Sequence, residues 1–110
     1  YGAVAAICAS TQYPELYGYT GMFSYCDNQN PEKMTEYIKE HMTPEILTDN
    51  RIYFYTGKYD FAYTSTKSAY EIAKENSLEN IHYELDEGQH DEYSWGTKFT
   101  ECLNFFCWIE

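Results

Sequence analysis

The chain of 110 residues has few basic residues and no apolar stretch that approaches the roughly 20 residues of a membrane-spanning helix. Its 7 Lys and Arg stand against 18 Asp and Glu, which gives a formal net charge of −11. A surface of that sign repels phosphate backbones and anionic lipid headgroups, so we expect neither a nucleic-acid nor a membrane partner. The same charge does not oppose a neutral small-molecule substrate.

The sequence also lacks any C-x-x-C pair, although it has 4 cysteines. Cys102 and Cys107 are too far apart in sequence to share one face of a helix. We interpret the cysteines, which also include Cys8 and Cys26, as small apolar core residues rather than as a disulfide framework. This usage slightly favours a reducing compartment such as the cytoplasm. The chain begins without Met and without a basic-then-apolar leader, and we expect further residues to precede Tyr1 in the native protein.

Three segments carry the pattern of short strands, and they cover residues 19–23, 51–56 and 81–85. The middle segment is the clearest, because β-branched and aromatic residues fill it without a breaker. Its continuous apolar run suits a parallel strand that is covered on both faces. Gly21 weakens the prediction for the first segment.

Four segments with apolar residues at three- and four-residue spacing separate and flank these strands. They are residues 2–10, a helix from Pro31 to Met42 with Asn30 as N-cap, a helix capped by Thr64 or Ser65 that carries Ala69 to Ala73, and residues 93–108. Helical connections between strands imply right-handed parallel crossovers. We therefore predict an α/β class fold over residues 1–110, a single domain with a three-stranded parallel sheet flanked by helices.

Two polar loops follow the second and third expected strands, where parallel α/β sheets collect their functional groups. The first loop ends at Asp60, and the second contains His90. A histidine base needs a carboxylate that holds its tautomer and stabilises its charged form. An aspartate after a strand is commonly just a turn residue, and a loop histidine is commonly just exposed. The element order and the spacing between the two loops favour Asp60 and His90 as a catalytic pair.

The other two histidines have no spacing typical of metal ligands. His41 lies near a helix end, where its charge would complement the helix dipole. His82 lies in the middle of a strand. From these positions we expect no metal site.

The two loops read Gly57-Lys58-Tyr59-Asp60 and Gly88-Gln89-His90, the second leading to Trp95. They resemble the G-x-x-D and G-x-H loops of the esterase D-like esterases, which have the α/β-hydrolase fold and include carbohydrate and feruloyl esterases. The stretch Tyr1-Gly2-Ala3 resembles the tail of that family's nucleophile elbow, G-x-S-M-G-G-x-G-A. Tyr13 to Gly18 resembles its H-P-x-L-F stretch. Glu92 stands where the family often has Trp.

The resemblance spans nearly the whole chain and implies the C-terminal part of an α/β-hydrolase catalytic domain. It implies a serine carboxylesterase with a Ser-Asp-His triad, in which Asp60 orients His90 and the serine lies about four positions before Tyr1. The substrate would be a small-molecule ester, such as an acylated carbohydrate or a phenolic ester, and no cofactor would be needed. Because the serine and the oxyanion-hole donors would lie outside the chain, we expect the 110 residues alone to be inactive.

Two alternatives from other functional classes stay open. The chain could be a noncatalytic α/β fragment or interaction module, which an in-frame G-x-S-x-G upstream of Tyr1 would argue against. Its 13 tyrosines could also bind sugars, although we expect most of them to pack in or near the core. Residues 24–50 stand where the family places a lid and are short, which predicts an open site. Without a partner strand, the strand over residues 19–23 would be an open edge through which the chain self-associates.

Overall fold

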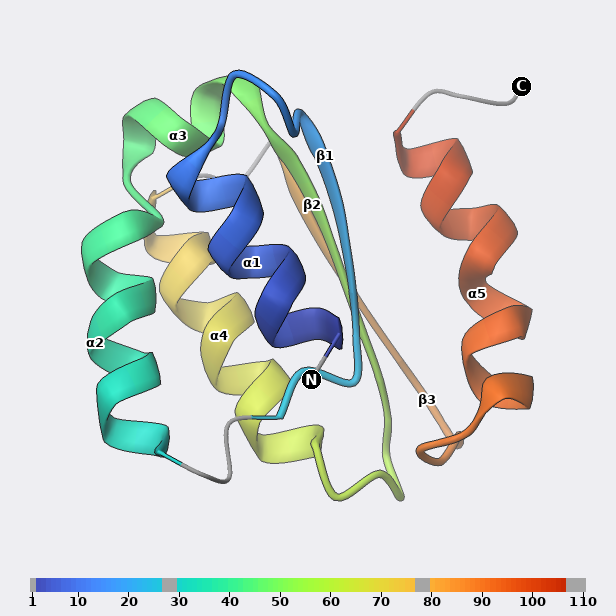
Figure 1. The fold of residues 1–110 in the computed structure, drawn as a ribbon. Helices are drawn as coiled ribbons and strands as arrows, with labels where there is room; N and C mark the ends of the chain where they lie inside the picture. The colour runs from blue at the N-terminus through green and yellow to red at the C-terminus, as the bar shows by residue number, and fades with distance from the viewer. Residues whose placement is uncertain (1, 27–29, 77–79, 107–110) are drawn as a thin grey trace.

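The computed structural model describes residues 2–26, 30–76 and 80–106. Helices and strands alternate along the chain, except that two helices follow the first strand (Figure 1). The strands are β1 (Tyr19–Phe23), β2 (Arg51–Gly57) and β3 (Ile81–Asp86). The helices are α1 (Gly2–Gln12), α2 (Pro31–His41), α3 (Pro44–Asp49), α4 (Tyr63–Asn76) and α5 (Glu92–Phe105).

The three strands form one parallel sheet in the order β1-β2-β3, which confirms the predicted fold class. The register aligns the strands end to end, with Tyr19 opposite Arg51 and Gly57 opposite Asp86. The loops that follow β2 and β3 therefore leave the sheet at the same edge. This register is what brings Asp60 and His90 to one end of the molecule.

The two faces of the sheet are covered unequally (Figure 1). Helices α1 to α4 lie on one face, and α5 alone lies on the other. Alternate β2 side chains enter the two layers, with Ile52 and Phe54 in the larger core and Tyr53 and Tyr55 in the smaller one. All four side chains are buried, which explains why β2 reads as a continuous apolar run.

Helix α3 was not predicted from the sequence. Its start carries the same signals as that of α2, whose N-cap Asn30 accepts from the backbone N–H of Lys33. At α3, the Thr43 side chain accepts from the backbone N–H of Ile46 at 3.4 Å, and Pro44 is the first helical residue. Only the capping signal could have revealed α3, since its 6 residues are too short for apolar periodicity.

The prediction that Thr64 or Ser65 caps the next helix is wrong, because α4 already begins at Tyr63. Asp60 organises this start instead. Its carboxylate accepts from the backbone N–H of Ala62 at 2.7 Å, and its carbonyl accepts from that of Tyr63 at 3.1 Å. The carboxylate and the carbonyl of Asp60 therefore cap the start of α4, in place of the expected Thr64 or Ser65 hydroxyl.

The last helix ends at Phe105, earlier than the predicted limit of Trp108. Trp108 and Cys107 lie outside the described residues, as does Tyr1. The other three cysteines are free thiols, and Cys102 is buried. Within the described part of the chain, no helix has the length and apolar character to cross a bilayer.

Candidate active site

Asp60 and His90 meet at the edge of the sheet where β2 and β3 end, as the sequence predicted. Nδ1 of His90 lies 3.0 Å from Oδ1 and 3.2 Å from Oδ2 of Asp60. The carboxylate can only accept, so Nδ1 carries the hydrogen and neutral His90 has its lone pair on Nε2. The Asp60 side chain is fully buried, whereas 34% of the His90 side chain is exposed. The pair therefore has a buried acid and an accessible base.

Two residues to which the sequence analysis gave no role at Asp60, Ser24 and Trp95, complete the surroundings of its carboxylate. The hydroxyl of Ser24 donates to Oδ2 of Asp60, and Nε1 of Trp95 donates to Oγ of Ser24 at 2.8 Å. Ser24 follows β1 directly and has a φ of 57°, which is the left-handed region. The chain of donors runs from Trp95 through Ser24 to Asp60, so three separate elements hold the carboxylate in place.

The glycines of the two loop motifs allow the loops to touch. A Cβ at Gly57 would lie 2.0 Å from the carbonyl oxygen of Gly88, a distance that no side chain tolerates. The contact is sealed by backbone hydrogen bonds, from Tyr59 N to Gly88 O at 3.1 Å and from Lys58 N to Asp86 O at 2.7 Å. No described glycine has a positive φ, so Gly57 is required for close approach rather than for an unusual backbone conformation.

Side chains at both ends of the second loop hold it in shape. Oδ1 of Asp86 accepts from the backbone N–H of Gly88 and from the hydroxyl of Tyr55, both at 2.7 Å. Burial and this bond to Asp86 raise the pKa of Tyr55, which stays a donor. At the other end, Asp91 caps α5 by accepting from the backbone N–H of Ser94 at 2.8 Å, which lowers the pKa of Asp91.

Aromatic rings fix the plane of the His90 imidazole. Phe61 stacks on it at 4.4 Å between centroids, and Trp95 meets it edge-on at 5.0 Å. No residue in the described ranges hydrogen-bonds to Nε2 of His90. The free nitrogen therefore stays available to exchange a proton with a group that enters the site.

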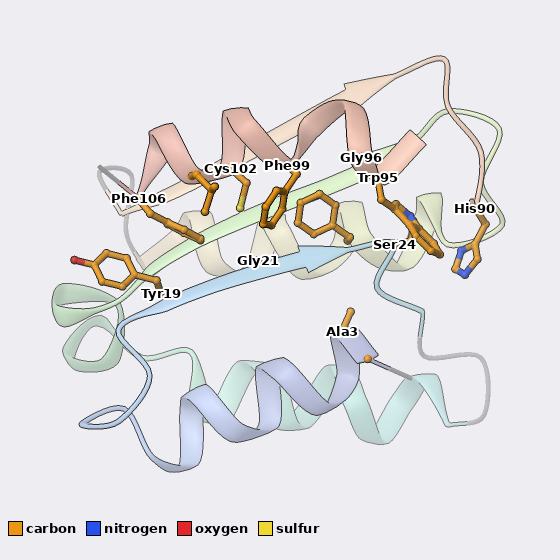
Figure 2. A pocket seen from close by; sticks show the side chains of 13 residues that line it. Ala3, Tyr19, Gly21, Ser24, His90, Trp95, Gly96, Phe99, Cys102 and Phe106 are labelled. Carbon is orange, nitrogen blue, oxygen red and sulfur yellow. The ribbon is translucent and has the colours of Figure 1, made fainter. Parts of the chain in front are cut away.

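His90, Ser24 and Trp95 stand at one end of a cavity of about 740 Å³ (Figure 2). The cavity is bounded by α5 on one side and by the first residues of α1 on the other, and β1 lies between them. Its walls are mainly apolar, with Phe99 of α5 and Phe106, the C-cap of that helix, along its length. This volume lies within the roughly 300–1,000 Å³ that is typical of small-molecule sites.

The remaining histidines lie away from this pair. His41 stacks on Tyr37 at 3.9 Å between ring centroids, and its Nδ1 donates to the backbone carbonyl of Tyr37 at 2.8 Å. His82 lies on the α5 face of the sheet, close to Glu84 and Glu101. The spacing of the histidines in the sequence does not reveal this cluster, because its third member comes from another element.

Comparison with known proteins gives one match. A family model with the description "Putative esterase" matches residues 1–106. No curated protein and no solved structure shows significant similarity to the chain.

Proposed function

The chain belongs to this esterase family, whose activity is ester hydrolysis, and from that premise we propose that it is part of a serine carboxylesterase. In this proposal Asp60 and His90 are the acid and the base of a Ser-Asp-His triad. The observation that carries the proposal is the bond from His90 Nδ1 to a fully buried Asp60 carboxylate, with Nε2 left free. This is the arrangement that makes a histidine a general base.

The proposed reaction follows from these positions. Nε2 of His90 takes the proton of a serine hydroxyl as the serine oxygen attacks the ester carbonyl. Asp60 stabilises the imidazolium, which then gives its proton to the leaving alcohol. Water, deprotonated by the same nitrogen, attacks the acyl-enzyme, and the serine recovers its proton as the carboxylic acid leaves. No cofactor takes part in these steps.

The serine is proposed to precede the described residues. Ser24 does not suit the role, because its hydroxyl donates to Asp60 rather than to His90. The first residues of α1, Gly2 and Ala3, line the same cavity as His90. The resemblance to a nucleophile elbow puts the serine about four positions before Tyr1, and four residues can span at most roughly 13–14 Å. A serine in that place would lie beside the cavity that His90 also lines.

Exposed aromatic side chains near the site support a phenolic or glycan ester as substrate. Tyr59 and Phe61 flank Asp60 and are each 65% exposed. Tyr93, at the start of α5, is 83% exposed. Flat apolar rings with a polar tip suit aromatic acids and sugar faces. The proposed substrate is therefore a phenolic or glycan ester, which agrees with the aromatic content of the sequence.

The outer edge of β1 is proposed to receive a further strand. β1 is one of the two edge strands of the described sheet, and the apolar cavity runs beside it between α1 and α5 (Figure 2). In a complete α/β-hydrolase domain the strand before α1 would occupy this place. In the isolated chain a second copy would compete for it, which gives self-association with rising concentration.

The test is a hydrolysis assay with short p-nitrophenyl esters on the protein extended upstream of Tyr1. Changing Asp60→Asn should lower kcat by roughly 10⁴-fold with little change in KM, because Asn favours the wrong His90 tautomer. The matched control is Glu87→Gln, which neutralises an exposed carboxylate in the neighbouring loop and should keep full activity. The rate of ester hydrolysis by the 110-residue chain alone should not exceed that of free imidazole.

Two outcomes would contradict the proposal. Equal activity of wild type and Asp60→Asn would favour a noncatalytic role for the two loops. An acyl-enzyme burst from the 110-residue chain alone would require a nucleophile within it, and Ser24, Ser65 and Ser94 would then be replaced one at a time.

A further inference from the structure

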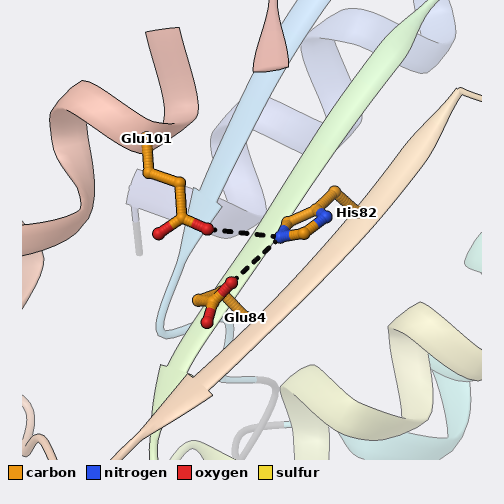
Figure 3. Close-up of side chains that lie close together, drawn as sticks. All are labelled: His82, Glu84 and Glu101. Carbon is orange, nitrogen blue, oxygen red and sulfur yellow. Dashed lines mark hydrogen bonds and ion pairs between the residues drawn. The ribbon is translucent and has the colours of Figure 1, made fainter. Parts of the chain in front are cut away.

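A second cluster of polar side chains lies on the α5 face of the sheet, apart from the Asp60 and His90 pair. His82 and Glu84 are alternate residues of β3, so their side chains point to the same face. Glu101 reaches them from α5 (Figure 3). Nε2 of His82 lies 3.0 Å from Oε2 of Glu84 and 3.5 Å from Oε1 of Glu101.

These three donor atoms have the separations that one metal ion requires. All three lie within 4.8 Å of one another. A tetrahedral zinc ion with bonds of roughly 2.0–2.2 Å keeps its donor atoms roughly 3.3–3.6 Å apart. Only small side-chain movements would close the cluster around an ion. Imidazole nitrogen and carboxylate oxygen are both ordinary zinc ligands.

The charges of the cluster leave room for a cation. The cluster has the two carboxyl groups of Glu84 and Glu101 against the single ammonium group of Lys98. Lys98 contacts the outer oxygens, with Nζ 3.9 Å from Oε1 of Glu84 and 3.5 Å from Oε2 of Glu101. The oxygens that face His82 are the opposite ones, so an ion could bind between them while Lys98 keeps its place.

Tyr53 provides an independent sign of a missing ligand. Its ring stacks on His82 at 5.3 Å, and its side chain is fully buried. The hydroxyl has no hydrogen-bond partner among the described residues. Burial, followed by the charges of Glu101 and Glu84, raises the pKa of Tyr53, so the hydroxyl lies in the field of the cluster. A buried hydroxyl without a partner is costly unless a water or ligand satisfies it.

We propose that His82, Glu84 and Glu101 form a binding site for a divalent transition-metal ion, with Zn²⁺ the best fit. Three protein donors leave the fourth position to a water molecule, to which the Tyr53 hydroxyl donates. The ion would tie α5 to β3 across the thinly covered face of the sheet. This site is separate from the proposed esterase reaction and does not depend on it.

The experiment measures binding of Zn²⁺ by calorimetry and of Co²⁺ by its visible d–d absorption, on the full chain without a histidine tag. Zn²⁺ should raise the unfolding temperature, and Co²⁺ should give the spectrum of nitrogen and oxygen ligands. His82→Gln and Glu101→Gln should each weaken binding by at least roughly 100-fold. His82→Cys should keep zinc, because a thiolate is also a zinc ligand.

The matched controls are His41→Gln and Glu40→Gln, which remove an imidazole and a carboxylate from α2, and both should bind zinc as the wild type does. His90→Gln tests the other histidine–carboxylate pair and should also leave binding unchanged. The proposal is overturned if the wild type shows no zinc binding. It is equally overturned if binding survives His82→Gln in a variant whose circular dichroism is native, or if His90→Gln is the change that abolishes it.

Discussion

The two faces of the sheet differ in how completely they are covered. One face supplies most of the apolar core, and the other carries the polar clusters. On the face of α1 to α4, eleven buried residues form one continuous core. On the α5 face the buried apolar cluster of the described residues has four members, Tyr53, Tyr55, Cys102 and Phe106, beside a cavity of about 740 Å³. The first face is packed on all sides, whereas the second leaves space and polar groups within reach of solvent.

The polar clusters all lie on or beside the thinly covered face. Trp95 of α5 reaches Ser24 at one end of this helix, and Glu101 reaches His82 further along it. Helix α5 thus closes both clusters, although it packs against the sheet through few buried side chains. A helix held by so little apolar area leaves His82, Glu84 and Glu101 partly exposed, so these charged groups keep part of their hydration. The contrast between the faces leads to four predictions, from the largest effect to the smallest.

Truncation of an aromatic residue should cost far more on the first face than on the second. Phe54→Ala empties a fully buried position and should lower the free energy of unfolding by about 3–5 kcal/mol. Phe99→Ala removes a ring that is 57% exposed and should change it by less than about 1 kcal/mol. Chemical denaturation of both variants measures the difference. Equal losses would show that α5 is packed as tightly as the other helices.

A glycine-to-alanine change should have opposite effects on stability in the contact between the two loops and on the surface of α5. Gly57→Ala drives a Cβ into the carbonyl of Gly88, so it should cost about 1–3 kcal/mol and move Asp60 away from His90. Gly96→Ala meets no atom within 4 Å on α5 and should stabilise the chain by about 0.5–1 kcal/mol. Thermal denaturation compares the two. A neutral Gly57→Ala would mean that the loops are not in fixed contact.

Replacement of Ser24 should show whether the left-handed backbone matters apart from the hydroxyl. Both Ser24→Ala and Ser24→Gly remove the bonds to Asp60 and Trp95, which should cost about 1–3 kcal/mol. Gly should be the milder change by about 1 kcal/mol, because it accepts a φ of 57° without strain. Unfolding of the pair in urea gives the comparison. Equal losses in the two variants would place the whole effect in the hydroxyl.

Alkaline pH should destabilise the packing of α5 on the sheet, because the buried Cys102 thiol and Tyr53 hydroxyl lose their protons. Burial, then the charge of Glu101, raises the pKa of Cys102 from 9.0 to about 12, and burial also raises the pKa of Tyr53. The folded state then holds protons that the unfolded state has lost, so stability is full below pH 9 and falls towards pH 12. Trp95 fluorescence during a pH titration should report the opening. Tyr53→Phe should flatten the decline, and an unchanged curve would exclude Tyr53 as a cause.

Local sequence signals predicted the positions of most elements, because helices and strands depend mainly on residues that are neighbours in the sequence. The strand over residues 19–23 was predicted to the residue, and the Asn30 cap of α2 is as expected. The start of α4 was misplaced because Asp60 begins that helix through its own carbonyl and carboxylate, whereas the sequence analysis placed the cap on the hydroxyl of Thr64 or Ser65. Helix α3 was not predicted, because a capping signal marks its start but its sequence shows no apolar periodicity.

The sequence by itself determined the α/β class and the meeting of Asp60 with His90, because parallel strands that end together must deliver their following loops to one edge. It could not determine what else would join them. Trp95 and Ser24 are 71 residues apart, and Glu101 reaches His82 from another element. Contacts of this kind depend on where α5 lies on the sheet and how it is turned about its axis. Only the packing of the folded chain sets that position, since periodicity shows which face of a helix is apolar but not which strand it will meet.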